Sequence, residues 1–266
     1  EWLGVPFESV RLVQGDTDAV AFGRGTYASR STMLGGSALK GAADAIIEKA
    51  KQMAGHLLET AVADIEFKEG KFTVKGTDKA IPMTDVAKAF YRPVGPTTKF
   101  GTGLDASGSS AVPPSFPNGC HVCELEIDPE TGVVEVVKYT MVDDFGVIVN
   151  PLLVEGQVHG GVTQGIGQAL MEAARYDRDG QFLTGSYMDY AMPRAADLPN
   201  FHFASHPVPA RSNILGVKGC GEAGCSGSLP AVMNAVVDAL RVYDINHIDM
   251  PATPYRVWQA IRAAQG

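Results

Sequence analysis

The sequence predicts an α+β protein in which mixed sheets pack against helices. Apolar residues recur at helical spacing in four segments, which favours helices at 38–58, 152–173, 229–242 and 254–264. Short segments rich in β-branched and aromatic residues occur in pairs around turn residues, which favours hairpins. The chain shows no convincing internal repeat, and its 266 residues are enough for one or two domains.

In the first half of the chain we expect a short strand at 9–14 before the helix at 38–58. A hairpin follows, because 65–67 and 72–74 flank a polar turn. Thr84 is a candidate N-cap for a short helix that ends at Phe90, before Pro93. Residues 93–119 are rich in Gly, Ser and Pro, so they predict either a long ordered loop or a flexible linker that joins subdomains 1–92 and 120–266.

A clearer hairpin is expected in the second half, where 121–127 and 133–142 flank the turn residues 128–132. A third hairpin is expected to turn at 177–180. The helix at 152–173 carries five interior glycines, each of which costs about 1 kcal/mol relative to alanine. They indicate that either a ligand or another helix approaches the backbone closely. These glycines are Gly156, Gly160, Gly161, Gly165 and Gly167.

Composition limits the classes of partner. The net charge of −8 disfavours nucleic acid and anionic membranes, both of which require basic surface. No apolar run approaches the roughly 20 residues of a membrane span, and no secretory signal is present. Cys120 and Cys123 have the spacing of a zinc pair, but an odd offset in a strand directs two side chains to opposite faces. The cysteines therefore indicate reduced packing residues of a cytoplasmic protein.

The most informative motif is the glycine turn 219–224, which holds the carboxylate of Glu222 ahead of an apolar helix. Glu222 could act as a general base in a confined site, or it could simply cap the helix that follows. The turn also satisfies the dinucleotide fingerprint G-x-G-x-x-G. That interpretation is the weakest, because few residues follow Gly224 and an anionic Glu222 would repel a pyrophosphate.

Four segments, in order over more than 200 residues, resemble the molybdopterin-binding region of the xanthine dehydrogenase and aldehyde oxidase family, the molybdenum hydroxylases. The carbon monoxide dehydrogenase large subunits belong to the same family. The resemblance implies the α+β fold of that cofactor-binding domain and covers nearly the whole chain, as the C-terminal half of the region. The matching segments are 15–17 with 25–31, 143–151, 154–167 and 216–224.

The resemblance implies roles for individual residues. Glu222 would be the general base of a hydroxylation in which water supplies the oxygen atom. The loop 28–31 would hydrogen-bond a molybdenum–molybdopterin cofactor, expected in its cytosine dinucleotide form. The metal would be held by the pterin and not by side chains of this chain. The implied cofactor contacts are Ala28, Ser29, Arg30, Ser31, Gln164, Gly221 and Gly224.

The resemblance also implies partners, because a complete molybdenum-binding region is two to three times longer. An upstream half of that region, together with Fe–S and FAD domains or subunits that accept the electrons, would complete an oligomeric enzyme. The substrate would be a small molecule, an aldehyde or a purine-like N-heterocycle. The chain could be a split subunit or an excised domain. A non-catalytic module that binds only a cofactor or a partner is the open alternative.

Overall fold

The computed structural model describes residues 1–20, 23–91 and 95–266. The chain divides into two compact units: Glu1–Thr26 with Leu34–Val112, and Tyr27–Met33 with Pro113–Gly266. Helices and strands occur in both, so the predicted α+β class is confirmed. Whether 93–119 acts as a linker stays a prediction, and residues 93 and 94 lie outside the described residues.

The first unit contains a small antiparallel sheet, most of one long helix and one short helix. The sheet has the order β1-β2-β3. Its bounds are Ile65–Lys68 for β1, Lys71–Val74 for β2 and Ala80–Pro82 for β3; the helices are α1, Ser31–Leu57, and α2, Met83–Tyr91. Met53 of α1, Phe72 of β2 and Phe90 of α2 are buried together in one apolar core.

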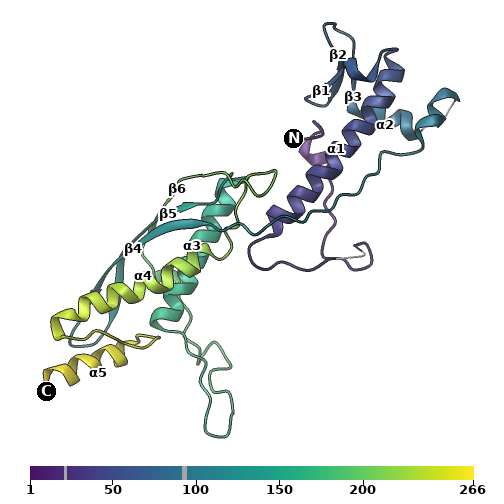
Figure 1. Ribbon diagram of the computed structural model, residues 1–266. Helices are drawn as coiled ribbons and strands as arrows, with labels where there is room; N and C mark the ends of the chain where they lie inside the picture. Colours follow the sequence, from purple (N-terminus) through teal and green to yellow (C-terminus); the bar gives the residue numbers. More distant parts are fainter. Residues whose placement is uncertain (21–22, 92–94) are drawn as a thin grey trace. The chain divides into compact units, whose positions relative to one another are not determined.

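The second unit contains a sheet with the order β4-β5-β6. Strands β4 (Asn118–Ile127) and β5 (Val134–Asp144) form the predicted hairpin and pair antiparallel. Strand β6 (Phe201–Ser205) pairs parallel to β5. A parallel neighbour requires a crossover connection, and this one contains helix α3, as Figure 1 shows.

Helices cover the inner face of this sheet (Figure 1). They are α3 (Pro151–Leu170) and α4 (Ala223–Leu240), while α5 (Pro254–Gln265) packs beside the turn between β4 and β5, where a Cβ on Gly132 would lie 2.0 Å from the carbonyl oxygen of Pro254. Tyr139 of β5 is fully buried beneath them, together with apolar side chains from all three helices. The described residues also include short 3₁₀ helices: η1 Phe7–Ser9, η2 Val62–Asp64, η3 Gly95–Phe100, η4 Ala195–Asp197 and η5 Arg241–Tyr243.

Several predicted elements differ from the structure. The strand at 9–14 is wrong: Val10, Leu12 and Val13 are exposed, so no buried face supports a strand there. The third hairpin is reduced to a single bridge between Tyr176 and Phe182. Strands β3 and β6 were not predicted. They have only three and five residues, and each is defined by its pairing with another strand and not by a pattern of its own.

Several helix boundaries also differ from those predicted. Thr84 lies inside α2 and is not its cap, while Pro93 lies outside the described residues. Helix α1 begins at Ser31 and not at 38, and α3 ends at Leu170. Helix α4 begins at Ala223 instead of 229, which brings Glu222 directly to its amino end. Within the described residues, no helix combines the length and hydropathy that crossing a bilayer requires.

Candidate functional site

Glu222 occupies the N-cap position of α4, but its side chain does not cap the helix. A capping side chain would accept a hydrogen bond from a backbone N–H of the first turn. The Glu222 carboxylate instead accepts a hydrogen bond from the hydroxyl of Ser29, with 2.8 Å between Ser29 Oγ and Glu222 Oε2. The residue is exposed. The carboxylate therefore has a use other than helix capping.

The loop that carries Ser29 lies directly against the glycine turn. Ala28 and Ser29 both adopt left-handed backbone conformations, with φ of 52° and 51°. A Cβ added to Gly219 would lie 2.1 Å from the carbonyl oxygen of Ser29, and one added to Gly221 would lie 3.2 Å from its hydroxyl. These two glycines permit the contact of two protein loops, which explains them without a dinucleotide.

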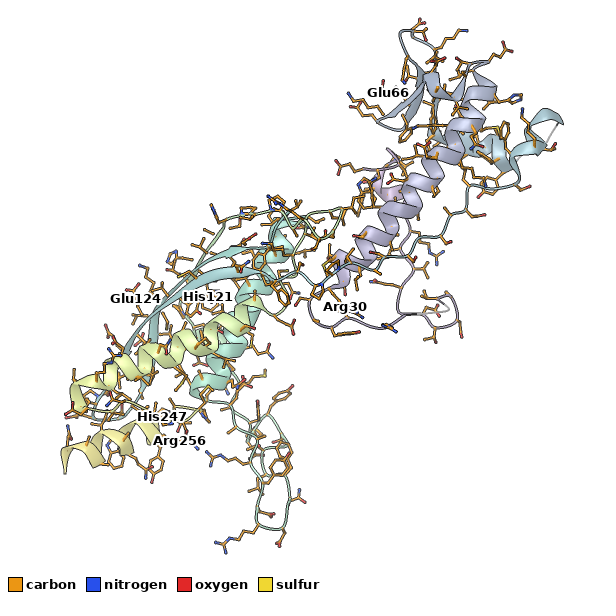
Figure 2. The ribbon with its side chains drawn as sticks, in the orientation of Figure 1. Arg30, Glu66, His121, Glu124, His247 and Arg256 are labelled. Atoms are coloured by element: carbon orange, nitrogen blue, oxygen red, sulfur yellow. The ribbon has the colours of Figure 1, made fainter. Side chains whose placement is uncertain are left out.

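Arg30 is held beside the same contact. Its guanidinium carbon lies 3.7 Å from the centroid of the Tyr27 ring, a cation–π geometry. Its Nε is buried and has no hydrogen-bond partner among the described residues. Figure 2 shows Arg30 near the start of α1, whose first residue is Ser31. A buried guanidinium N–H of this kind is suited to an anionic acceptor, which the described part of the chain does not supply.

The segment before the glycine turn is fixed by an ion pair between Lys218 and Asp144, whose side chains are 11% and 12% exposed. Asp144 Oδ1 accepts hydrogen bonds from the backbone N–H groups of Gly146 and Val208, each at 2.8 Å. Burial opposes ionisation of Asp144, but the Lys218 ammonium and these N–H groups outweigh it and hold the pKa of this carboxyl below its ordinary value.

We call the Asp144–Lys218 ion pair the Asp144–Lys218 brace, and backbone hydrogen bonds support it. The Lys218 N–H donates to the carbonyl of Phe145 at 2.8 Å. The buried side chain of Asn213 bonds both backbone groups of Val217, at 2.9 and 3.2 Å. The matched segments 143–151 and 216–224 therefore lie side by side, and the position of Glu222 depends on both.

Helix α3 packs against the first turns of α4 through glycines. A Cβ on Gly161 would lie 2.9 Å from the backbone nitrogen of Cys225, and one on Gly165 would lie 1.8 Å from the hydroxyl of Ser228. By contrast, nothing lies within 4 Å of a Cβ built on Gly156 or Gly160. Helix packing thus explains part of the predicted glycine cluster, and an open face remains.

The structure brings some predicted site residues together and not others. Ser29, flanked by Ala28 and Arg30, contacts both Gly221 and Glu222. Gly224 is buried against α3, where its Cβ would lie 2.4 Å from the carbonyl of Val158. Gln164 is exposed on α3 and makes no hydrogen bond to the glycine turn within the described part of the chain.

A buried polar group beneath α4 was not predicted from the sequence. His121, labelled on β4 in Figure 2, lies 2.9 Å from the Tyr139 hydroxyl and 3.1 Å from Asp143 Oδ1. The other oxygen of Asp143 is buried without a partner in the described residues. A Cβ on Gly227 would approach the His121 ring to 2.5 Å. The alternation of residues along β4 could have predicted this, because His121 has the same parity as the inward-facing Cys123 and Leu125.

The four cysteines are free thiols, and Cys123 and Cys220 pack against the core as predicted, whereas Cys120 does not. Cys120 is exposed and Cys123 packs against the core, so the two lie on opposite faces of β4 as predicted. Burial, with a smaller contribution from Glu124, raises the pKa of Cys123 to about 11. Burial also raises the pKa of Cys220 and of Cys225. Among the described residues, no group of three His, Cys, Asp or Glu side chains could hold a metal ion.

Residues 1–199 match the family model of the molybdopterin cofactor-binding domain. The chain belongs to this family, and it is a molybdopterin-binding domain of the molybdenum hydroxylase type. The family that the four sequence segments predicted is therefore confirmed.

The relatives show how much of such a protein the chain represents. It is 37% identical to the carbon monoxide dehydrogenase large chain of Hydrogenophaga pseudoflava, over 98% of this chain and 32% of the relative. It is 39% identical to the nicotine 6-hydroxylase large subunit of Paenarthrobacter nicotinovorans, over 99% and 32%. The chain thus spans about a third of the length of the curated relatives it matches.

Solved structures of molybdenum enzymes have the same fold as this chain. A crystal structure of a Cu,Mo-CO dehydrogenase superposes with a TM-score of 0.92 at 35% identity, covering 99% of this chain and 33% of that one. Quinoline 2-oxidoreductase from Pseudomonas putida 86 superposes with a TM-score of 0.79 at 36% identity, covering 91% and 31%.

Proposed function

We propose that the second unit forms one wall of the molybdenum–pterin site of a hydroxylase, with Glu222 as its general base. The observation that carries this proposal is the state of the Glu222 carboxylate. It is exposed at the end of a braced loop, and it does not cap its helix. Ser29 contacts that loop, Asp144 and Phe145 contact Lys218 just before it, and α3 packs on the helix that follows it, which supports a shared role for the matched segments.

The donors near Glu222 fit the proposed cofactor. A molybdopterin presents phosphate and pterin heteroatoms, which require hydrogen-bond donors and positive charge. Arg30 offers a buried N–H without a partner in the described residues. Ala28, Ser31, Gly221 and Gly224 would contribute through backbone or hydroxyl groups. Gln164 would contact the cofactor from the exposed side of α3, near the open glycines Gly156 and Gly160.

In this proposal the bound molybdenum centre supplies the two-electron oxidation of the substrate carbon. Glu222 accepts the proton of the water whose oxygen enters the product. Ser29 bonds one carboxylate oxygen, and the second oxygen is left to accept that proton. The Asp144–Lys218 brace keeps the turn in place during proton transfer, since a general base requires fixed geometry.

The remaining wall and the electron acceptors would come from elsewhere. The chain's share of its relatives' length supports an upstream part of the molybdenum-binding region, with Fe–S and FAD partners in a larger assembly. We propose a cytosine dinucleotide form of the cofactor and a cytoplasmic location. The substrate would be an aldehyde or an N-heterocycle. Two relatives bear the names of enzymes for nicotine and quinoline, which supports the N-heterocycle.

The test is to replace Glu222 in the full-length enzyme. Glu222→Gln removes the proton acceptor but keeps the size of the side chain, so molybdenum and pterin content should stay at the wild-type level. Turnover should fall by at least about 100-fold, the usual scale of a lost general base. Metal analysis, pterin release and steady-state kinetics measure the three quantities.

Glu124→Gln is a matched control. Glu124 is exposed on β4 and forms a surface ion pair of 3.3 Å with Lys138, so turnover should change less than twofold. Near-normal turnover of Glu222→Gln would reject the catalytic role. Wild-type protein without molybdenum or pterin, even when produced with its partner chains, would favour the non-catalytic module.

A further inference from the structure

We propose that Ser29 is a positioning residue whose hydroxyl fixes the Glu222 carboxylate for proton transfer. This inference rests on the proposed function of Glu222. It differs from the cofactor contact that family resemblance implies for Ser29, because the structure commits the hydroxyl proton to the carboxylate.

The hydrogen-bonding capacity of the hydroxyl separates the two roles. A serine hydroxyl donates one hydrogen bond and otherwise only accepts. Ser29 Oγ donates to Glu222 Oε2 at 2.8 Å. The phosphate and carbonyl oxygens of a cofactor are acceptors, so they cannot use a proton that is already donated. The Ser29 hydroxyl therefore serves Glu222, and Arg30, with its buried N–H, is the better donor to a cofactor.

The backbone around Ser29 is shaped for this contact. Ser29 has a φ of 51°, a left-handed conformation that costs a non-glycine residue free energy. Gly219 and Gly221 lack the side chains that would push Ser29 away, with Cβ positions 2.1 Å from its carbonyl oxygen and 3.2 Å from its hydroxyl. A strained loop and two glycines thus combine to bring one hydroxyl to one carboxylate.

Positioning is useful because Glu222 is exposed. A glutamate in solvent samples several rotamers, and only some of them place its oxygen beside the reacting water. Bonding Oε2 selects one arrangement and leaves Oε1 as the proton acceptor. Loss of the hydroxyl should therefore reduce the fraction of enzyme in the reactive geometry without weakening substrate binding.

The experiment uses the full-length enzyme with Ser29→Ala and Ser29→Gly. Both variants lack the hydroxyl, but glycine tolerates the left-handed backbone better than alanine. We expect kcat to fall roughly tenfold in both, the scale of one lost hydrogen bond to a charged group, with KM, molybdenum and pterin unchanged. Full activity in Ser29→Gly alone would show that backbone strain is responsible and would overturn the proposal.

Two further measurements separate this inference from the proposed function. In a Glu222→Gln background, Ser29→Ala should change the residual rate less than twofold, because the group it positions is gone. A crystal structure of loaded Ser29→Ala enzyme should show the Glu222 carboxylate displaced from its wild-type position. Loss of cofactor in Ser29→Ala, or an undisplaced carboxylate with full kcat, would overturn the positioning role while leaving Glu222 as the base.

Ser186→Ala is the matched control. Ser186 also donates a hydrogen bond to a carboxylate, with 2.7 Å between its Oγ and Asp189 Oδ2. This pair is exposed and lies in the connection between α3 and β6. Its removal should change kcat less than twofold. A tenfold loss in this control would mean that the assay reports any lost serine–carboxylate bond and not the position of Glu222.

Discussion

At the scale of single residues, Asp144 joins two of the matched segments, 143–151 and 216–224. Its carboxylate pairs with Lys218 and receives two backbone N–H groups, so the bend after β5 and the turn before α4 move together. Removing one partner of a pair this deeply buried leaves the other charge without compensation. The brace is therefore the feature on which the geometry of Glu222 depends most.

We predict that Asp144→Asn lowers the free energy of unfolding by about 3 kcal/mol at pH 7. The Lys218 ammonium would stay charged and largely buried without an anionic partner. The folded pKa of Asp144 is depressed. Its contribution is therefore fully present above its ordinary value of 3.8 and is lost as pH falls through the folded pKa. Denaturant midpoints of wild type and variant should converge as the pH falls below the ordinary pKa of 3.8 and through the lower folded pKa. A constant difference across that range would contradict the assignment.

At the scale of elements, the α3–α4 pair shows what a sequence pattern can and cannot specify. The five glycines of α3 predicted a close approach, and two alternatives for the approaching group were left open. The structure assigns Gly161 and Gly165 to helix packing and leaves Gly156 and Gly160 open. Periodicity alone could not separate these pairs, since which face of a helix meets a neighbour is set by tertiary contacts.

We predict opposite effects of alanine at two of these glycines. Gly161→Ala places a Cβ 2.9 Å from backbone atoms of α4 that cannot rotate away, so it should destabilise the protein by about 2 kcal/mol. Gly156→Ala meets nothing within 4 Å and should stabilise the helix by up to about 1 kcal/mol. Chemical denaturation measures both. Equal effects at the two positions would show that the helix contact is not as described.

Helices and hairpins with strong local signals were predicted well, whereas elements defined by distant pairing were not. The hairpin of β4 and β5 follows from alternating residues around a turn. Strand β6 depends on a parallel register with β5, and no local pattern encodes it. For the site, motif resemblance pointed to Glu222 and Ser29, but only the folded chain shows their bond. The His121–Asp143 contact likewise joins residues whose partners cannot be read from either strand alone.

At the scale of the whole chain, each unit has its own apolar core, and the two cores share no buried residue among those described. Local unfolding within one core should therefore leave the other protected. The matched family model spans residues of both units, whereas Ser29 and Glu222 both lie in the second unit and the strands β1–β3 belong to the first.

We predict that Phe72→Ala increases amide hydrogen exchange in β1, β2 and α2 but not in α3 or α4. Phe72 is fully buried in the first core, and its truncation should cost about 3–5 kcal/mol there. Exchange measured by mass spectrometry on the full-length protein tests this. Val162→Ala, in the second core, is the reciprocal variant and should increase exchange in α3 and α4 only. Exchange that spreads across both units in either variant would show that they unfold as one.

The bond between Ser29 and Glu222 spans 193 positions of the chain. At a synthesis rate of about 5–20 residues per second, a ribosome would need roughly 10–40 s to add the second partner after the first. Helix α1 and the first sheet are complete long before then. The hydroxyl and the carboxylate can therefore meet only after residue 222 has been made, so the contact between these two loops forms well after the helix and sheet of the first unit have been synthesised.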